Sequence, residues 1–256
     1  MVFRNSLGLT IFLCVGLATG RSAQADTSFK FLTGATDRSG TAYISTNGGI
    51  SYEDVYLGQY QIQLGSGTNA KSLFTYCVDV QHDILVGDTT RSKLINFTDS
   101  KSGFATAGYN NGADAAAKQK NANAVAYLLD SYLNHSITTA KSIDVSLSIW
   151  DIVNDNGNGL TAGKFQVKAD GGTSITASNY TDVVTDVNQL IKTAYSADPK
   201  KIGGVTWVDN PKLIDGTTRY QDYGIHTLDA VPEFSTLLGF GSLLALGGVA
   251  TFRKRK

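Results

Sequence analysis

The sequence predicts one β-rich α+β domain with about three helices, flanked by an N-terminal signal peptide and one C-terminal transmembrane helix. Three observations support this fold class. The 256-residue chain is rich in Gly (27), Tyr (12) and Phe (11) but has only three Pro. Apolar residues alternate with polar ones at both ends of its central part, and between these regions apolar residues recur at helical spacing.

Alternation of apolar and polar residues predicts strands from about residue 28 to residue 86. Gly48-Gly49, Gly58 and the segment 65–67 separate these strands, as expected for turns. Strands are predicted to return near 205–208 and 220–228. The alternating segments in the first region are 43–45, 56–57, 60–64 and 73–80.

Three later segments have the spacing of amphipathic helices. The second of them, near 143–153, also alternates like a strand, so the pattern leaves both structures open there. The apolar positions of the other two segments are Val125, Leu128, Leu129, Tyr132 and Leu133, and Val183, Val184, Val187, Leu190, Ile191 and Ala194.

Residues 1–25 have the order of a secretory signal peptide. Arg4 precedes an apolar run over 7–18, and Ala23-Gln24-Ala25 forms a small-x-small cleavage site. We therefore expect signal peptidase to cut after Ala25 and the protein to be exported through the inner membrane.

The other end resembles a membrane anchor. Residues 234–252 contain no ionisable side chain, and as a helix they would extend about 28 Å, nearly the thickness of the bilayer hydrocarbon. A basic tail follows directly, which predicts that the C-terminus stays cytoplasmic while the body lies outside. The tail residues are Arg253, Lys254, Arg255 and Lys256.

The residues before this segment suggest a sorting signal. Val231-Pro232-Glu233, the apolar segment and the basic tail together resemble the PEP-CTERM sorting domain over residues 231–256. That resemblance implies recognition by an exosortase-type membrane protease, a Gram-negative envelope, and a product at the cell surface or in the extracellular matrix. Residues 26–230 then remain as one ectodomain.

The zero net charge of the chain belongs to the precursor. The signal peptide and the tail carry six basic residues and no acidic one, which leaves 16 basic and 22 acidic residues between Asp26 and Glu233, a formal charge of about −6. An acidic body argues against adhesion to an anionic polymer by simple charge attraction, and against nucleic acid as a partner.

Export removes Cys14 and leaves Cys77 as the one thiol outside the cell, so it has no partner for an internal disulfide. Packing as a small apolar residue is one interpretation. Tyr76-Cys77-Val78-Asp79 is also similar to a motif of bacterial thioester domains, and the segments 55–60, 124–130 and 148–153 match further parts of that pattern in the expected order.

The resemblance implies an internal thioester between the Cys thiol and a Gln side chain. Ser146 stands where that Gln is expected, and a serine has no carboxamide. We therefore favour a thioester-like scaffold that has lost the bond. A thioester-forming covalent adhesin remains an alternative if the fold brings Gln81, Gln119 or Gln189 to Cys77.

The sequence also contains candidate residues for a hydrolase site and for a metal site. A secreted hydrolase would need a His beside Cys77, with His82, His135 and His226 as candidates. Segment 154–159 begins like a calcium loop, and Asp79, His82 and Asp83 could converge on a metal, but a Gly/Asn turn and opposite strand faces explain these residues more simply.

The sequence thus predicts a non-enzymatic exported cell-surface or extracellular-matrix protein, anchored transiently in the membrane. We expect no cofactor and no metal. The expected partners are signal peptidase, the exosortase-type protease, the membrane, and an extracellular polysaccharide or other surface ligand.

Overall fold

A computed structural model gives the structure of the protein. It describes residues 27–82, 87, 89–107, 110–112, 114–133, 135–169, 173–210 and 221–226.

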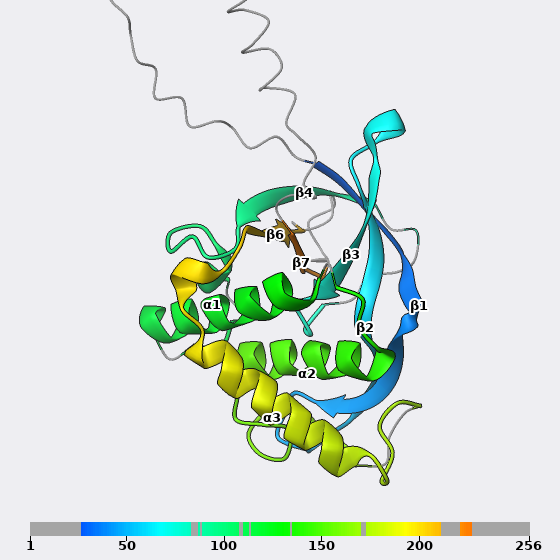
Figure 1. Cartoon of the computed structure of the whole chain (residues 1–256), viewed down its shortest axis with the longest axis vertical. Coiled ribbons are helices and arrows are strands. Elements are labelled where there is room, and N and C mark those ends of the chain that lie inside the picture. The colour runs from blue at the N-terminus through cyan, green and yellow to red at the C-terminus, as the bar shows by residue number, and fades with distance from the viewer. Residues whose placement is uncertain are drawn as a thin grey trace, which may run out of the picture.

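The strands of the described residues form one sheet in which every pairing is antiparallel (Figure 1). Its order is β2-β3-β7-β6-β4-β1-β5. The strands are β1 (Thr27–Ser45), β2 (Glu53–Leu64), β3 (Lys71–Cys77), β4 (Thr89–Asn96), β5 (Gln166–Val167), β6 (Val205–Asp209) and β7 (Tyr223–His226).

The sheet closes on itself through β1. Phe29 in this strand lies opposite Leu64 of β2 on one side and opposite Thr90 of β4 on the other. Because β2, β3, β7, β6 and β4 are paired in that order, the path along the sheet returns to β1. The 19-residue length of β1 lets its far end also pair with β5, with Ile44 opposite Val167.

Aromatic side chains fill part of the core between these strands. The Phe29 and Tyr223 rings stack with centroids 5.2 Å apart, and Phe31 lies 5.7 Å from Tyr60. Tyr60 in turn meets Tyr223 edge to face at 6.1 Å. These four rings come from β1, β2 and β7, so they join the first strands of the domain to the last one.

Three α-helices group on one side of the sheet (Figure 1): α1 (Ala115–Tyr132), α2 (Thr139–Asp155) and α3 (Tyr180–Ser196). α2 is central, because it contacts β1, β2, α1 and α3. Every residue of α2 from Ser142 to Asp155 is therefore buried. Because no face of this part of the helix is exposed, its apolar residues are not confined to one face, and their pattern in the sequence also resembles a strand. The short 3₁₀ helices are η1 (Gly67–Asn69), η2 (Phe104–Thr106) and η3 (Pro199–Lys201).

Polar residues fix the helix ends. The Asp114 side chain accepts a bond from the Ala117 amide at 2.8 Å, and the Thr138 hydroxyl accepts one from Lys141 at 3.2 Å. Such N-caps satisfy amides that have no partner within the helix. Asn156 ends α2 in the left-handed conformation at φ 58°.

The predicted fold class was wrong. The strands from both ends of the body belong to one closed antiparallel sheet; α1 and α2 contact this sheet, and α3 packs on α1 and α2. The strands β4 and β5 were not predicted. Alternation identifies a strand and its two faces, but closure depends on which distant strands pair. The three helices do lie over the segments with helical spacing.

The membrane part of the predicted fold class is not supported either. In the described ranges, no helix combines the length and the apolar character that crossing a membrane requires. The predicted transmembrane segment 234–252 and the signal peptide 1–25 both lie outside those ranges.

We expect the Gly58→Ala variant to be markedly less stable. Gly58 has φ +104° opposite Ser39, and an added Cβ would lie 2.1 Å from the Arg38 carbonyl oxygen. Backbone strain and the clash should together lower the free energy of unfolding in urea by about 3 kcal/mol or more.

Gly67→Ala is the matched control, because φ is +60° there and nothing lies within 4 Å of the added Cβ. It should lose only about 1 kcal/mol from backbone strain. Equal losses in the two variants would contradict the steric explanation.

Candidate functional site

The Cys77 thiol is enclosed where β3 ends. Cys77 is fully buried, and its Sγ donates to the Asp79 carbonyl oxygen at 2.9 Å and accepts from the Asp79 amide at 3.3 Å. These two contacts make the thiol part of the turn that follows the strand.

One face of α2 packs against this turn. Trp150 donates its indole N–H to the Cys77 carbonyl oxygen at 3.1 Å, and the Tyr76 hydroxyl donates to the Ser142 hydroxyl at 3.3 Å. Ser146 lies between Ser142 and Trp150 on the same helical face, since residues four apart align. Its buried Oγ has no hydrogen-bond partner in the described part of the chain.

Burial raises the pKa of the Cys77 thiol well above its ordinary value, and the charge of Asp79 raises it further. The thiolate is the reactive form of cysteine, so the thiol of this site is held in its unreactive form at neutral pH. The contacts and the pKa direction together favour a packing role.

In the described part of the chain, no hydrogen bond joins the Cys77 thiol to the glutamines considered from the sequence. The Gln119 amide donates to the Thr98 carbonyl oxygen and to the Asn123 side chain, and the Gln189 amide donates to Thr193 on α3. The Gln81 backbone amide donates to the Asp79 carboxylate, while its side chain is exposed.

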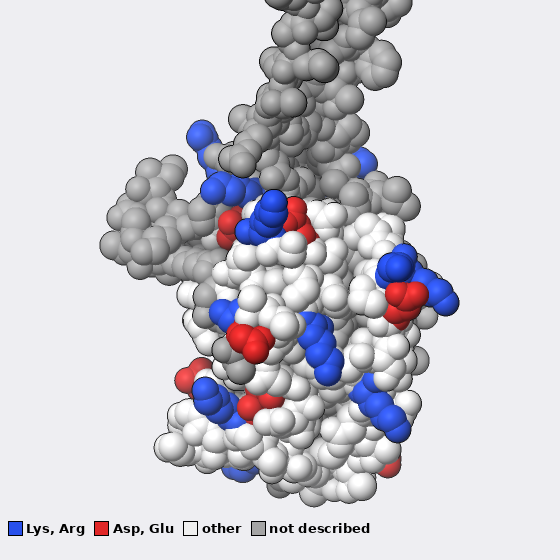
Figure 2. Space-filling model, turned by 90° about the vertical axis from the view of Figure 1, so that its left-hand side faces the viewer, with Lys and Arg blue, Asp and Glu red and all other residues white. Residues whose placement is uncertain are grey.

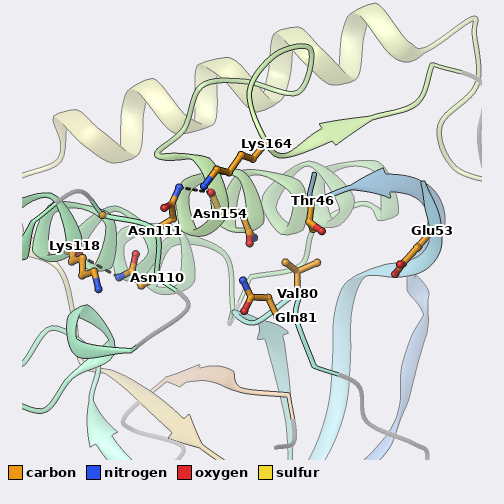
Figure 3. A pocket seen from close by; sticks show the side chains of 10 residues that line it. Thr46, Glu53, Val80, Gln81, Asn110, Asn111, Lys118, Asn154 and Lys164 are labelled. Carbon is orange, nitrogen blue, oxygen red and sulfur yellow. Dashed lines mark hydrogen bonds between the residues drawn. The ribbon is translucent and has the colours of Figure 1, made fainter. Parts of the chain in front are cut away.

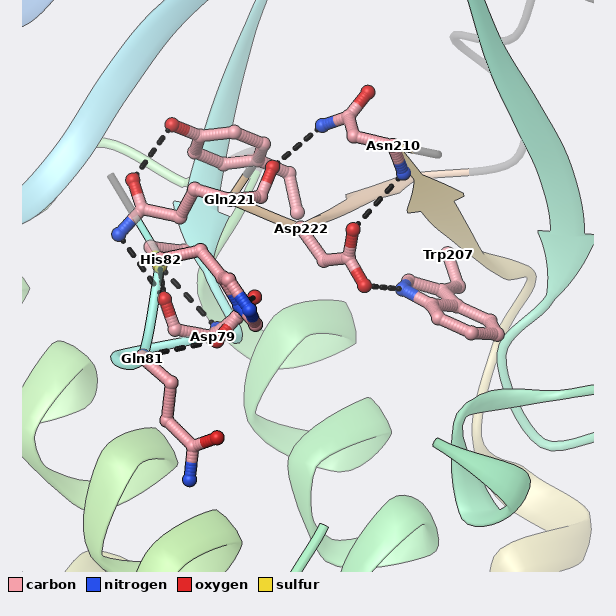
Figure 4. Close-up of polar contacts among 9 residues, drawn as sticks. Asp79, Gln81, His82, Trp207, Asn210, Gln221 and Asp222 are labelled. Atoms are coloured by element: carbon pink, nitrogen blue, oxygen red, sulfur yellow. Dashed lines mark hydrogen bonds and ion pairs between the residues drawn. The ribbon is translucent and has the colours of Figure 1, made fainter. Parts of the chain in front are cut away.

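A fourth glutamine lies close to the thiol. The Gln221 amide donates to the Asp79 carbonyl oxygen at 3.1 Å, the same oxygen that accepts from Cys77 Sγ (Figure 4). The Tyr223 hydroxyl donates to Gln221 Oε1 at 2.8 Å. Pairing of β3 with β7 brings this residue in from far along the chain, and no local motif marks it.

The candidate histidines do not form a Cys–His pair in the described residues. The recorded partners of Cys77 Sγ are backbone atoms of Asp79. His82 Nδ1 lies 2.5 Å from the Asp79 carboxylate, His226 Nε2 lies 3.5 Å from the Asp130 carboxylate, and His135 is exposed.

The segment 154–159 is a turn that ends α2, and both carboxylate oxygens of Asp155 already accept hydrogen bonds. Asp155 Oδ2 accepts from the amides of Lys164 at 2.6 Å and Phe165 at 3.2 Å, and Oδ1 accepts from the Asn158 side chain at 3.1 Å. Within the described residues, no group of three or more His, Cys, Asp or Glu side chains could hold a metal ion. Asp83 of the other metal candidate lies outside them.

A polar cavity of about 600 Å³ lies beyond the turn that follows Cys77 (Figure 3). Its wall combines the ends of β1 and β2, the turn after β3, the start of α1 and the end of α2. Sequence reasoning did not find it, because its residues come from segments far apart in the chain. They are Thr46, Glu53, Val80, Gln81, Asn110, Asn111, Gly112, Lys118, Asn154 and Lys164.

Comparison of the chain with known protein families, curated proteins and solved structures finds no match. The resemblances to the PEP-CTERM sorting domain and to thioester domains therefore stay predictions. The predicted sorting and cleavage residues lie outside the described residues: Ala23, Ala25, Val231, Pro232, Glu233, Arg253, Lys254, Arg255 and Lys256.

Asp151, next to Trp150, is a carboxyl of α2 with a strongly raised pKa. It is fully buried, its Oδ2 accepts from the Gly159 amide at 2.8 Å, and its Oδ1 has no partner in the described part of the chain. Burial raises its pKa to about 7, and the Gly159 N–H partly opposes that shift while the Asp155 charge adds to it.

We expect the Asp151→Asn variant to flatten the pH dependence of stability. The native pKa of about 7 lies above the ordinary value of 3.8, so the native state binds the proton more tightly than the unfolded state. The stabilisation that this proton provides disappears as pH rises towards 7. Between about pH 4 and pH 7, the unchanged chain should lose about 2 to 4 kcal/mol more unfolding free energy than the variant.

Asn retains an oxygen acceptor for the Gly159 amide but cannot ionise. The difference between the two proteins in how unfolding free energy changes with pH therefore reports the ionisation of the Asp151 carboxyl alone. Urea unfolding at several pH values measures this difference. Parallel curves for the two proteins would show that this carboxyl titrates alike in the folded and unfolded states.

Proposed function

We propose that the chain is a non-enzymatic exported protein of the cell surface or extracellular matrix, and that its body acts by binding. The signals predicted at its two ends support export through the inner membrane and sorting by an exosortase-type protease. The closed sheet and central α2 support a rigid body, because interactions among distant segments fix both.

The observation that carries this proposal is the polar cavity next to the Cys77 turn. Binding sites are concave, with a few placed polar groups that set specificity. The neighbouring thiol is enclosed and bonded to backbone atoms, which suits a support for the cavity wall better than a nucleophile.

Export is tested by fractionation in a Gram-negative host that has an exosortase system. We expect the chain, with an epitope tag inserted in the exposed turn 66–68, in the envelope or the matrix. Deleting residues 231–256 should release the body into the periplasm or medium, because the sorting signal is then missing.

A variant with a disrupted signal peptide, in which residues 7–18 are deleted, is the control and should stay in the cytosol. Recovery of the unchanged chain only from the cytosol would disprove the proposal.

A second candidate function is a covalent adhesin that forms a thioester. The specific observation in its favour is Gln221, whose carboxamide shares a carbonyl acceptor with the Cys77 thiol. In this reaction Sγ would bond to the Gln221 Cδ, the carbon–nitrogen bond would break, and ammonia would leave with the thiol proton. A bond donated by Tyr223 to Gln221 Oε1 would stabilise the charge that develops there.

Intact mass distinguishes the two candidates. The leading proposal predicts the full sequence mass for freshly folded protein, whereas a thioester would make it about 17 Da lighter through the loss of ammonia. Methylamine should then open the thioester and add about 31 Da to that lighter species.

Cys77→Ala and Gln221→Glu are the controls, because neither can form this bond. A mass deficit that both substitutions abolish would establish the thioester and overturn the leading proposal. Full mass in all three proteins would exclude the second candidate.

A further inference from the structure

We propose that the polar cavity binds a sugar unit that carries a carboxylate, as in an acidic polysaccharide. This names the ligand class of the proposed binding protein and so rests on the proposed function. The charge distribution, the fixed amide groups and the size of the cavity carry the inference.

The cavity is electrostatically polarised. In Figure 3, Lys118 lies on the left, Lys164 lies above Asn111 and Asn154, and Glu53 lies on the far right, so both ammonium groups are on the side away from Glu53. The described residues include no ion-pair partner for either ammonium group. Two cations and one carboxylate therefore leave the cavity with a positive formal charge on an acidic body, and its basic end is suited to a ligand carboxylate.

Fixed amide groups lie between Lys118 and Glu53 in Figure 3. Asn154 donates its side-chain N–H to the Trp150 carbonyl oxygen at 2.9 Å, and Asn111 donates to the Asn154 carbonyl oxygen at 2.6 Å. Each bond uses a nitrogen and leaves the amide oxygen as an acceptor. Gln81 points towards Asn154 across the cavity (Figure 3).

These hydrogen-bond acceptors indicate which groups the rest of the ligand carries. Amide oxygens and the Glu53 carboxylate attract hydroxyl donors and repel a bare anion. A volume of about 600 Å³ is within the range of sites for organic ligands and much larger than one inorganic anion needs. Hydroxyl groups and one carboxylate on the same small molecule describe a uronic acid.

The face drawn in Figure 2 shows no simpler site for a polyanion among its described residues. Figure 2 shows basic and acidic side chains interspersed among uncharged residues on one face, without a continuous basic strip. Selection of an acidic sugar should therefore depend on the local geometry of the cavity.

Calorimetric titration of the full chain with a uronic-acid hexasaccharide, oligogalacturonate, tests the proposal. We expect saturable binding, with much weaker binding of the neutral hexasaccharide maltohexaose and of inorganic phosphate. Lys118→Gln and Lys164→Gln should each weaken binding of the acidic hexasaccharide about tenfold, because each removes a charge-assisted bond.

Lys200→Gln is the matched control, since it removes the same charge from an exposed residue of η3 outside the cavity. It should bind like the unchanged chain, and near-ultraviolet circular dichroism should be the same for every variant. Lys164 is exposed, so its substitution tests the site without disturbing the core.

Three results of the hexasaccharide titrations would overturn the proposal: no binding of the acidic hexasaccharide, equal binding of the neutral one, or equal weakening by Lys200→Gln. Equal binding of phosphate would reduce the cavity to a general anion site and would overturn it too. Because binding is measured on purified protein, its failure is distinct from a failure of export in the fractionation experiment.

Discussion

Pairing of β1 along both of its edges is the constraint on which the rest of the structure depends. Phe29 lies opposite Leu64 and Thr90 at once, so the first strand joins β2 to β4 and the sheet has no open side between them. Closure of the sheet stacks Tyr223 on Phe29. This contact holds β7 inside the sheet, although β7 comes near the C-terminal end of the body. Closure also places β7 beside β3 and so determines what surrounds Cys77.

α2 connects the closed sheet to the candidate site. Its Trp150 indole holds the Cys77 carbonyl oxygen, and its end supplies Asn154 to the polar cavity. One buried helix thus connects the enclosed thiol with the proposed binding site. The unsatisfied Ser146 hydroxyl lies on the same helix, at the position where the thioester resemblance implies a glutamine. The carboxamide that shares a carbonyl acceptor with the Cys77 thiol comes instead from Gln221.

Charge has different roles in different parts of the chain. The basic residues predicted to direct export lie at the two ends, and the body between them is acidic. Inside the body, Lys118 and Lys164 nevertheless converge on one cavity. Net charge alone argued against an acidic polymer as a partner, but it averages over the surface. A concave site with two ammonium groups can attract a single carboxylate at short range, where the remaining acidic residues have less effect.

The sequence by itself determined the local structure. Apolar spacing located α1 and α3, including the stripe of Val187, Leu190, Ile191 and Ala194 that α3 buries, and left helix and strand both open over 143–153, where α2 lies. Alternation located β2 and β3, and the strand predicted over 205–208 coincides with β6, in which Val205 to Val208 are all buried. Only the tertiary structure decided the closed sheet, the approach of Gln221 to Cys77 and the polar cavity. Each of these depends on pairings between residues far apart in the chain, and a local pattern records which face of a strand is buried but not which strand lies beside it.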